Sequence, residues 1–433
     1  MNNGTGYVMD PDFVAKDIEQ DNLLGIKMVR MGIGGIGGYK PADAFHWEKR
    51  DAVIDAYVKA GIRIMGDVTP RGQVDHGADD QAWEDNWRRY IHEIMSHCKG
   101  RVSYYIIDNE PDKGRGRDKV APEFEVGLLR IAYEEAKAVD PSIMIESPPV
   151  NAPASPYLHA LMQAGVDKYC DFIGIHAYGS QIRDGRFDKP WQWEKELGIR
   201  KPISVSEFGA TAAWHPPGMD GETWCARWLT QSYVQAKRFG YSQMLLFDLD
   251  GHGQGMPWAF VNGLDGSWTP VQPGYDTIKN GFLAQGLTDG GFENGNDPDW
   301  GWQTSFNPDD AQPPQGVAFL TDGANAHSGK GCLSLSPGQN KGSLAVRRVV
   351  EKLTPGQAVT ISAWVKVSGG GATLRAMGYD PEDGTAEEKA VSTGSGDWQE
   401  LSVKVTPGKT WVVIELAAEG SDGTVLWDDV SLQ

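Results

Sequence analysis

Short apolar runs alternate with longer helix-like segments along the first 250 residues, and this alternation limits the fold more than any other feature of the sequence. Seven runs rich in β-branched and aromatic residues have strand character, at 26–31, 62–68, 102–108, 143–147, 171–178, 203–209 and 243–250. Between them, segments such as 46–61, 82–98, 123–140 and 223–240 repeat apolar residues at helical spacing. Strands separated by helices pair in parallel, so the alternation predicts an α/β fold built on a parallel sheet.

An abbreviated eighth strand at residues 5–9, with the sequence TGYVM, would complete a (β/α)8 TIM barrel over residues 1–285. An open doubly wound sheet is the alternative. That fold commonly carries a phosphate-binding glycine fingerprint after its first strand, whereas the glycine-rich segment 31–38 (MGIGGIGG) opens no convincing dinucleotide unit. We therefore predict the barrel, with 31–38 as a loop at its mouth.

The sequence changes character after about residue 286. Residues 286–302 are rich in turn-forming residues, and the segments 359–367, 398–405, 411–419 and 425–432 then alternate apolar and polar residues without helical periodicity. Short alternating strands are typical of antiparallel sheets packed face to face. We predict an all-β sandwich domain over residues 286–433.

The charge balance narrows the classes of partner. The chain has 433 residues, with 59 acidic against 40 basic side chains and a formal net charge of -19. A field of this sign repels phosphate backbones and anionic membrane surfaces, so nucleic acid is not expected as a partner. It also mildly disfavours strongly anionic polysaccharides, although a local basic pocket could override it.

The cysteines and the first ten residues bear on whether the protein is cytoplasmic or secreted. Cys98, Cys170, Cys225 and Cys332 form no C-x-x-C pair and show no metal-ligand spacing, so we expect isolated, buried thiols. No apolar run approaches a membrane span, and the first ten residues lack the regions of a secretory signal. The chain is therefore either cytoplasmic or secreted with its signal removed. We expect the secreted form, as a monomer.

Two glutamates end predicted strands of the barrel. Glu110 closes the fourth strand and Glu207 the seventh, when residues 5–9 count as the first. The carboxyl ends of barrel strands form the active face, and His176 and Tyr178 lie on the strand between these two. Each glutamate alone would be a surface or capping carboxylate. Together they predict glycoside hydrolysis, in which one carboxyl group protonates the leaving oxygen and the other attacks or activates water.

The motifs DNEPD at 108–112 and SEFG at 206–209 carry a resemblance to a known group. On these strands they resemble the retaining glycoside hydrolases of clan A, a superfamily of β-glycanases and β-glycosidases that includes families 5, 39 and 128. The resemblance covers nearly the whole predicted barrel. It departs from the pattern at Asp108, where many relatives have Trp or Gly, and a third carboxylate there could raise the pKa of Glu110.

The resemblance implies roles for the strand-end residues. It makes Glu110 the acid/base and Glu207 the nucleophile, and it makes Asn109 the partner of the 2-hydroxyl of the sugar. Tyr178 would hydrogen-bond Glu207, and His176 would line the floor of the sugar subsite. Arg30, at the end of the run 26–31, resembles an arginine that supports the nucleophile electrostatically. The alternative for Arg30 is a salt bridge at the barrel rim.

Tryptophans near the predicted active face are candidate sugar platforms, because the apolar faces of pyranose rings stack on indole. Any one of them could instead belong to the core. Those that fall in segments after the sixth, seventh and eighth strands are Trp191, Trp193, Trp214, Trp258 and Trp268. As a group they favour a cleft with several subsites.

The C-terminal domain resembles carbohydrate-binding modules of the β-sandwich type, with GGFENG at 290–295 and LWDDVSL at 426–432. Strand alternation within 359–367 turns Trp364 away from the core, as a candidate platform unless a loop or the barrel covers it. Related modules often hold a structural calcium ion between the opening glutamate and a closing aspartate. The resemblance therefore implies a site at Glu293 and either Asp428 or Asp429, with ordinary surface carboxylates as the alternative.

These observations lead to one expected function with two rivals. We expect a retaining endo-β-glycanase that cleaves a mostly neutral polysaccharide, β-glucan as the first guess, by double displacement without a catalytic cofactor. An exo-acting β-glycosidase of the β-xylosidase type is the rival within enzymes. A catalytically silent glycan-binding protein that kept the fold is the rival outside them.

Overall fold

The computed structural model describes most of the chain, in two compact units. The described residues are 10–33, 47–70, 80–113, 120–249, 260–261, 266–268, 270–271, 274–281, 286–287, 289–296, 301–304, 315–338, 342–380, 384–394, 396–420 and 423–433. One unit comprises residues 1–213 and 241–275, and the other comprises 214–240 and 276–433.

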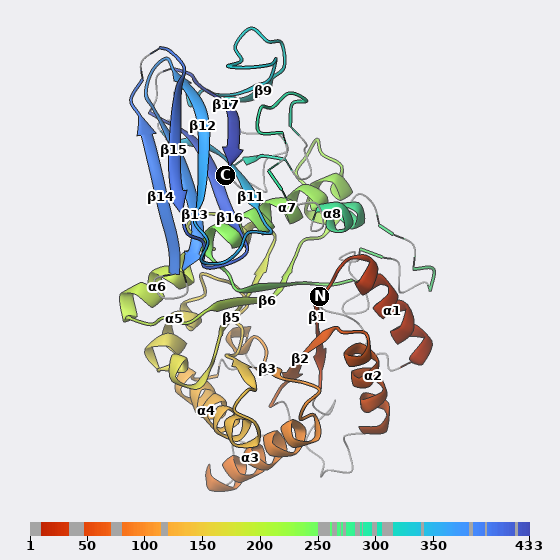
Figure 1. Ribbon diagram of the computed structural model, residues 1–433. Coiled ribbons are helices and arrows are strands. Elements are labelled where there is room, and N and C mark those ends of the chain that lie inside the picture. Colours follow the sequence, from red (N-terminus) through yellow and green to blue (C-terminus); the bar gives the residue numbers. More distant parts are fainter. Residues whose placement is uncertain are drawn as a thin grey trace. The chain divides into compact units, whose positions relative to one another are not determined.

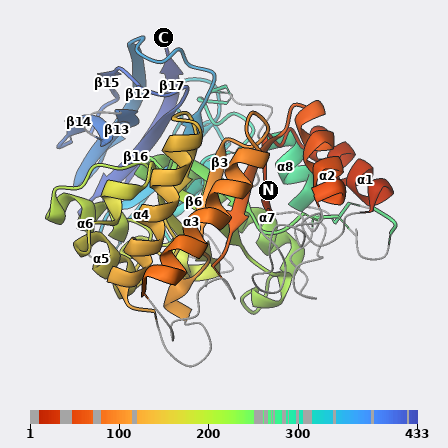
Figure 2. The ribbon, with the colours of Figure 1, turned by 90° about the horizontal axis from the view of Figure 1, so that it is seen from below.

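The first unit alternates helices and strands, as the sequence predicts (Figure 1). Its strands are β1 (Met28–Gly32), β2 (Arg63–Val68), β3 (Tyr104–Ile107), β4 (Met144–Glu146), β5 (Ile173–Tyr178), β6 (Ile203–Gly209) and β7 (Gln243–Leu246). Its helices are α1 (Pro11–Leu23), α2 (Trp47–Lys59), α3 (Asp80–His97), α4 (Pro122–Val139), α5 (Pro156–Gln163) and α6 (Lys189–Leu197). Short 3-10 turns η3 (Pro111–Lys113), η4 (Val166–Tyr169), η5 (Gly179–Ile182) and η6 (Ala212–Trp214) follow several of these, and α8 (Gly274–Gly281) spans the boundary between the units. Figure 2 shows α3 and α4 side by side, outside the strands.

All seven strands of the first unit run parallel, in the orders β1-β2-β3-β4 and β5-β6-β7. Single parallel bridges, Glu146 to Phe172 and Val150 to Ile175, join β4 to the β5 side. Met28, Met65, Tyr104, Ile106 and Leu245, from β1, β2, β3 and β7, pack in one interior cluster. Strands at both ends of the series therefore share one interior, which is the arrangement that a barrel needs.

Closure of the barrel stays a prediction. Among the described residues β1 and β7 do not pair, and the expected first strand at residues 5–9 lies outside the described part of the chain, as does most of the predicted glycine-rich loop 31–38. β3 and nearly all of β5 are buried along their length, so these strands are covered on both faces. Strands covered on both faces read as continuous apolar runs, which is how the sequence revealed them.

The second unit is built on two five-stranded antiparallel sheets. Their orders are β15-β12-β17-β10-β9 and β14-β13-β16-β11-β8. The strands are β8 (Gln303–Thr304), β9 (Val317–Leu320), β10 (Cys332–Leu335), β11 (Leu344–Val350), β12 (Val359–Val367), β13 (Gly371–Asp380), β14 (Gly384–Ser392), β15 (Gln399–Val405), β16 (Val412–Glu419) and β17 (Val425–Leu432). Buried residues of both sheets meet in one core around Phe292 and Trp427, so the predicted sandwich is present.

Helix α7 (Gly221–Phe239) belongs to the second unit, although the sequence predicts it as a barrel helix between β6 and β7. Val234 packs with Val349, Met377, Trp411 and Val413 on one sheet of the sandwich. Polar contacts reinforce this packing, because Lys237 and Tyr233 of the helix both bind Glu351. The boundary at residue 285 stays a prediction, and the compact units instead place 214–240 with the sandwich.

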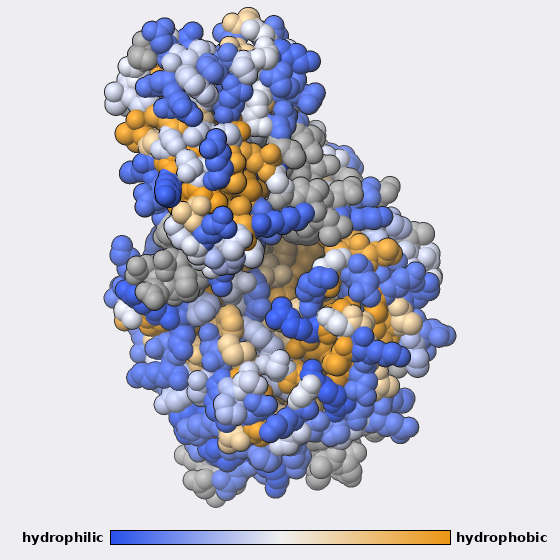
Figure 3. Space-filling model, viewed as in Figure 1, coloured by the Kyte–Doolittle hydropathy of each residue, from blue (hydrophilic) through white to orange (hydrophobic). Residues whose placement is uncertain are grey.

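Surface and membrane features follow the composition. The face of the molecule in Figure 3 is largely hydrophilic, with apolar residues gathered in patches. Among the described helices, none is long and apolar enough to cross a membrane. The four cysteines are free and buried, as expected.

Candidate active site

Glu110 follows β3 in a tight turn. Asp108 and Glu110 have positive φ angles of 68° and 50°, a conformation that side chains other than glycine adopt rarely. Hydrogen bonds hold the turn, because the amide of Asp108 donates to Val68 and that of Glu110 donates to Pro149. Pro111 then begins η3. Unfavourable backbone conformations of this kind concentrate at functional sites, so the turn directs attention to Glu110.

Glu207 lies on β6 where the pairing is irregular. The β5–β6 register shifts between Ile175 and His176, and the β6–β7 register shifts between Val205 and Phe208. A local bulge re-aims a side chain that regular alternation would direct elsewhere. The side chains of Glu207 and Glu110 remain only 12% and 13% exposed.

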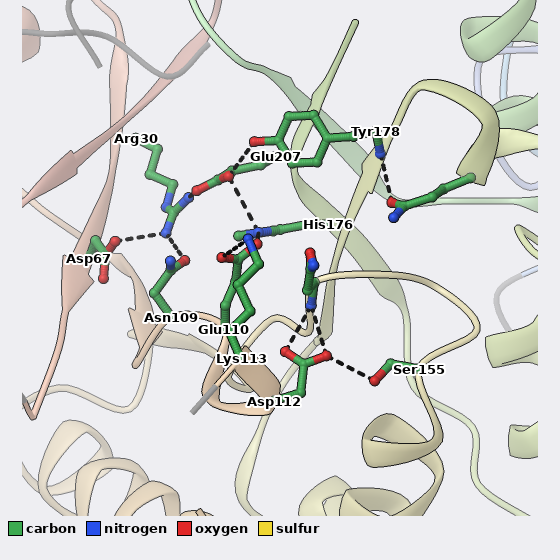
Figure 4. Close-up of polar contacts among 12 residues, drawn as sticks. Arg30, Asp67, Asn109, Glu110, Asp112, Lys113, Ser155, His176, Tyr178 and Glu207 are labelled. Atoms are coloured by element: carbon green, nitrogen blue, oxygen red, sulfur yellow. Dashed lines mark hydrogen bonds and ion pairs between the residues drawn. The ribbon is translucent and has the colours of Figure 1, made fainter. Parts of the chain in front are cut away.

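His176 lies between the two glutamates, as Figure 4 shows. Its Nδ1 is 3.0 Å from Oε1 of Glu110 and 3.3 Å from Oε2 of Glu207, and its side chain is fully buried. Ionised carboxylates only accept hydrogen bonds, so Nδ1 carries the proton and donates toward both. One oxygen of each glutamate and this nitrogen lie within 4.8 Å of one another. The expected pair of carboxylates is therefore brought together by the fold.

Arg30 of β1 supports Glu207 from the other side. Its guanidinium contacts Glu207 through one terminal nitrogen, and through the other it donates to Asp67 at 2.7 Å and to Asn109 at 2.6 Å. The side chain is 5% exposed, so the alternative of a rim salt bridge does not describe it. Its burial disfavours the charged form, but the carboxylates of Asp67 and Glu207 outweigh this and raise the pKa of Arg30. Arg30 is thus a permanent buried cation beside Glu207.

Tyr178 completes the surroundings of Glu207, because its hydroxyl donates to Oε2 of that residue. Burial alone would raise the pKa of Glu207, yet His176, Arg30 and the Tyr178 hydroxyl together lower it. The contacts expected for Tyr178 and Arg30 are therefore present. Glu207 is ionised over the ordinary pH range.

Glu110 is also held in its ionised form, by His176 again and by Lys113. Burial raises its pKa, while the hydrogen bond from His176 and the ammonium of Lys113 lower it to about 2. Nζ of Lys113, on η3, is 2.7 Å from Oε2 of Glu110. The expectation that Asp108 would raise the pKa of Glu110 is wrong, because these two donors outweigh the other influences on the carboxyl group.

Two residues of the site were not predicted from the sequence. Asp67 is the last residue but one of β2, so attention to polar residues near strand ends could have identified it. Its burial raises its pKa, which the Arg30 guanidinium partly offsets. Lys113 follows Glu110 by three residues, a spacing that brings side chains together on one turn of helix.

Glu110, His176 and Glu207 are also the set that could hold a metal ion among the described residues. Arg30 and Lys113 already pair with the two carboxylates. Both carboxylates are therefore charge-compensated by side chains of the protein itself. Absence of a catalytic cofactor stays a prediction.

The predicted tryptophan platforms have varied outcomes. Trp258 lies outside the described residues. Trp214 is 47% exposed and belongs to the second unit. Trp191 and Trp193 lie on α6, where they contact the rings of Tyr241 and His159, and Trp268 packs against Phe13. Their roles as sugar platforms stay predictions.

In the second unit, Trp364 has the predicted orientation. Burial alternates strictly along β12, with Trp364 on the face turned away from the core. The imidazole of His327 stacks on the indole at 3.9 Å with an interplanar angle of 12°, and Trp398 approaches the same imidazole. A loop residue therefore covers part of the predicted platform.

The carboxylates of the predicted calcium site are engaged by backbone donors. Glu293 accepts from the amides of Lys330 and Gly331, and Asp428 accepts from those of His327 and Ser328. Within the described residues, no group of three carboxylate or imidazole ligands gathers there. The structural calcium ion stays a prediction.

Comparisons with known proteins agree with this architecture. Residues 284–424 match the family described as carbohydrate binding domain. The whole chain resembles the crystal structure of a glucosidase from Croceicoccus marinus, with 12% identity and a TM-score of 0.51, covering 93% of this chain and 92% of the other. The GH39 enzyme from Xanthomonas axonopodis pv. citri has 13% identity and a TM-score of 0.49, covering 97% of this chain and 93% of the other. A monomeric beta-xylosidase from Caulobacter crescentus CB15 has 13% identity and a TM-score of 0.48, covering 97% of this chain and 95% of the other.

A comparison with curated proteins finds no match to the sequence. The likeness to the glucosidase shows a shared fold over nearly the whole of both chains. The predicted resemblance to glycoside hydrolases is therefore present at the level of the fold. The carbohydrate-binding resemblance of the C-terminal region is present at the level of sequence.

Proposed function

We propose that the chain is a retaining glycoside hydrolase that acts on β-linked glycans. The observation that carries this proposal is the pairing of Glu110 and Glu207 at the ends of β3 and β6, with one oxygen of each within 4.8 Å of the other. Retaining enzymes place their carboxyl groups about 5 to 5.5 Å apart, whereas inverting enzymes leave about 6.5 to 9.5 Å for a water molecule. The close approach of the two carboxylates, with Arg30 and Tyr178 around Glu207, supports direct attack by that carboxylate.

The surroundings assign the two roles. Glu207, ionised and held by Arg30 and Tyr178, attacks the anomeric carbon and forms a glycosyl ester. Glu110 donates a proton to the glycosidic oxygen as the C–O bond breaks, and then accepts a proton from the water that cleaves the ester. Asn109, which accepts a hydrogen bond from Arg30, would bind the 2-hydroxyl.

The proposed substrate class rests on the comparisons with known proteins. A mostly neutral polysaccharide such as β-glucan is the first choice, because the C-terminal region matches a carbohydrate-binding family and a tethered module raises the effective concentration of polymer. The likeness to a glucosidase favours the second candidate, an exo-acting β-glycosidase. In either case the protein would act outside the cell.

Trapping of the intermediate tests the mechanism. Incubation with a 2-deoxy-2-fluoro glycoside that carries an activated leaving group should increase the mass of the protein by one glycosyl unit, located on the peptide that contains Glu207. Product analysis on a polysaccharide panel then separates the candidates, since a ladder of oligomers indicates endo action and a single small product indicates exo action. Inverted products, or a label on another residue, would contradict the assignment.

A further inference from the structure

We propose that Lys113 binds an anionic group, a carboxylate or a sulfate, on the sugar that leaves. The preferred substrate would then be a mostly neutral glycan with an acidic residue directly after the scissile bond. This inference rests on the proposed function and extends it to the leaving-group side of the site. It follows from the way in which the two oxygens of Glu110 are occupied.

The oxygens of Glu110 have different partners. Oε1 is 3.0 Å from Nδ1 of His176, a fully buried ring that also approaches Glu207. Oε2 is 2.7 Å from Nζ of Lys113, whose side chain is 55% exposed (Figure 4). Because His176 is fixed in the interior, Oε2 is the oxygen that Glu110 can present to a glycosidic bond. The ammonium of Lys113 occupies that position in the free protein.

Glu110 therefore cannot donate a proton while Lys113 stays in place. A general acid works best when its pKa is near the working pH, and the pKa of Glu110 is held at about 2 in part by Lys113. Binding of a leaving-group sugar at Oε2 has to displace the ammonium. Removal of the cation from the carboxylate then raises the tendency of Glu110 to take up a proton.

The displaced ammonium, on a side chain that is 55% exposed, is available to an anion. Asp112 is the adjacent acid in the sequence, but its carboxylate accepts from the amide of Asn151 and the hydroxyl of Ser155. Within the described residues, the recorded ion pair of Lys113 is with Glu110. An anionic group on the leaving-group sugar would supply the missing charge, and the bond between them would form only as Glu110 is released.

The sequence at this point is basic in an otherwise acidic chain. Residues 113–119 (KGRGRDK) contain four basic side chains and one acidic side chain, against a formal net charge of -19 for the whole chain. The proposed site itself consists of Lys113 beside Glu110.

The proton and bond changes balance without a further reactant. Glu110 takes a proton from solvent once Lys113 has moved to the anion, and transfers it to the glycosidic oxygen as that oxygen leaves the anomeric carbon. Glu207 forms the new bond to the same carbon. The anionic group is not consumed, and it leaves with the released sugar.

Aryl glycosides with charged leaving groups test the proposal. Neutral aryl glycosides of graded phenol acidity define a line of log kcat/KM against leaving-group pKa. Substrates with a ring carboxylate and with a ring sulfonate, a sulfate surrogate, are compared with that line. The full-length protein should cleave the anionic substrates about tenfold faster than the line predicts, as for a charge-assisted hydrogen bond. High salt should reduce this excess.

Two variants distinguish a specific site from a general charge effect. Lys113→Gln should return the anionic substrates to the line, and should extend activity on neutral substrates to higher pH because Glu110 loses a cation. Lys16→Gln is the matched control, since Lys16 forms an exposed pair with Glu19 at the same 2.7 Å and is also 55% exposed. The Lys16→Gln variant should keep the same excess for anionic substrates as the unmodified protein.

The outcomes separate this inference from the proposed function. Cleavage of neutral aryl glycosides with no excess for either anion, or an excess that survives Lys113→Gln, overturns the role of Lys113 and leaves the hydrolase intact. An excess for the carboxylate alone or for the sulfonate alone identifies which anion is recognised. If no aryl glycoside is cleaved and no glycosyl ester forms, both proposals are wrong.

Discussion

Glu207 and Glu110 lie in one site, yet the cations that hold them differ in kind. Glu207 is paired with Arg30, which is buried and is itself fixed by Asp67 and Asn109. Glu110 is paired with Lys113, which is mostly in solvent. A buried, shared cation keeps its free carboxylate ionised, whereas an exposed lysine can leave. The difference suits a permanent nucleophile beside a group that must gain and lose a proton.

The largest expected effect comes from removal of Glu207, the proposed nucleophile. Glu207→Ala should lower kcat by roughly 10⁴-fold or more, even with a leaving group that needs no protonation, because the first bond cannot form. Added azide should restore turnover and give a glycosyl azide of the opposite anomer to the substrate. NMR of the product measures this, and a retained anomer would exchange the roles of the two glutamates.

Removal of the acid/base should act mainly on the second step. Glu110→Ala should still form the glycosyl ester from an activated aryl glycoside, but hydrolyse it slowly because water lacks its general base. A loss of about 10²- to 10⁴-fold is expected for substrates with poor leaving groups. Pre-steady-state release of the phenol should show a burst, and azide should give the β-glycosyl azide. A variant without burst or rescue would contradict the assignment.

Arg30→Lys tests whether a buried positive charge is sufficient. Lysine keeps the charge but loses the planar fork that reaches Glu207, Asp67 and Asn109 together, so kcat should fall by up to about 10²-fold. Arg88→Lys is the control, because Arg88 also bridges two carboxylates, Glu134 and Glu135, on the surface of α3 and α4. Equal losses in both variants would indicate a general effect on the fold.

The smallest effect concerns stability. The pKa of Glu110 is about 2 in the folded protein, below its ordinary value of 4.5, so ionised Glu110 stabilises the fold above about pH 4.5. That contribution is lost as the pH falls from 4.5 through 2. Lys113→Gln should lower the free energy of unfolding by less than about 1 kcal/mol at pH 7, and by less still near pH 2. Urea unfolding at both pH values measures it, and a cost that grows in acid would contradict the pairing.

Sequence reasoning succeeded where local pattern decides structure. Continuous apolar runs predicted the parallel strands, and alternation predicted β12 with Trp364 on its outer face. Because carboxyl ends of parallel strands meet at one edge, the positions of Glu110 and Glu207 at strand ends were enough to predict their pairing. These inferences need only the two backbone periodicities and the direction of the chain.

Tertiary structure decided what depends on distance between side chains. Folding brought His176 onto Glu110 beside Lys113, reversed the expected direction of the pKa shift of Glu110, and joined Arg30 to Glu207 across 177 positions of the sequence. It also placed α7 on the sandwich and His327 on Trp364. The sequence by itself determined the strands, helices and strand-end carboxylates, since backbone periodicity is local. The charge state of each carboxylate is set by burial and by its neighbours, and only the folded chain brings these together.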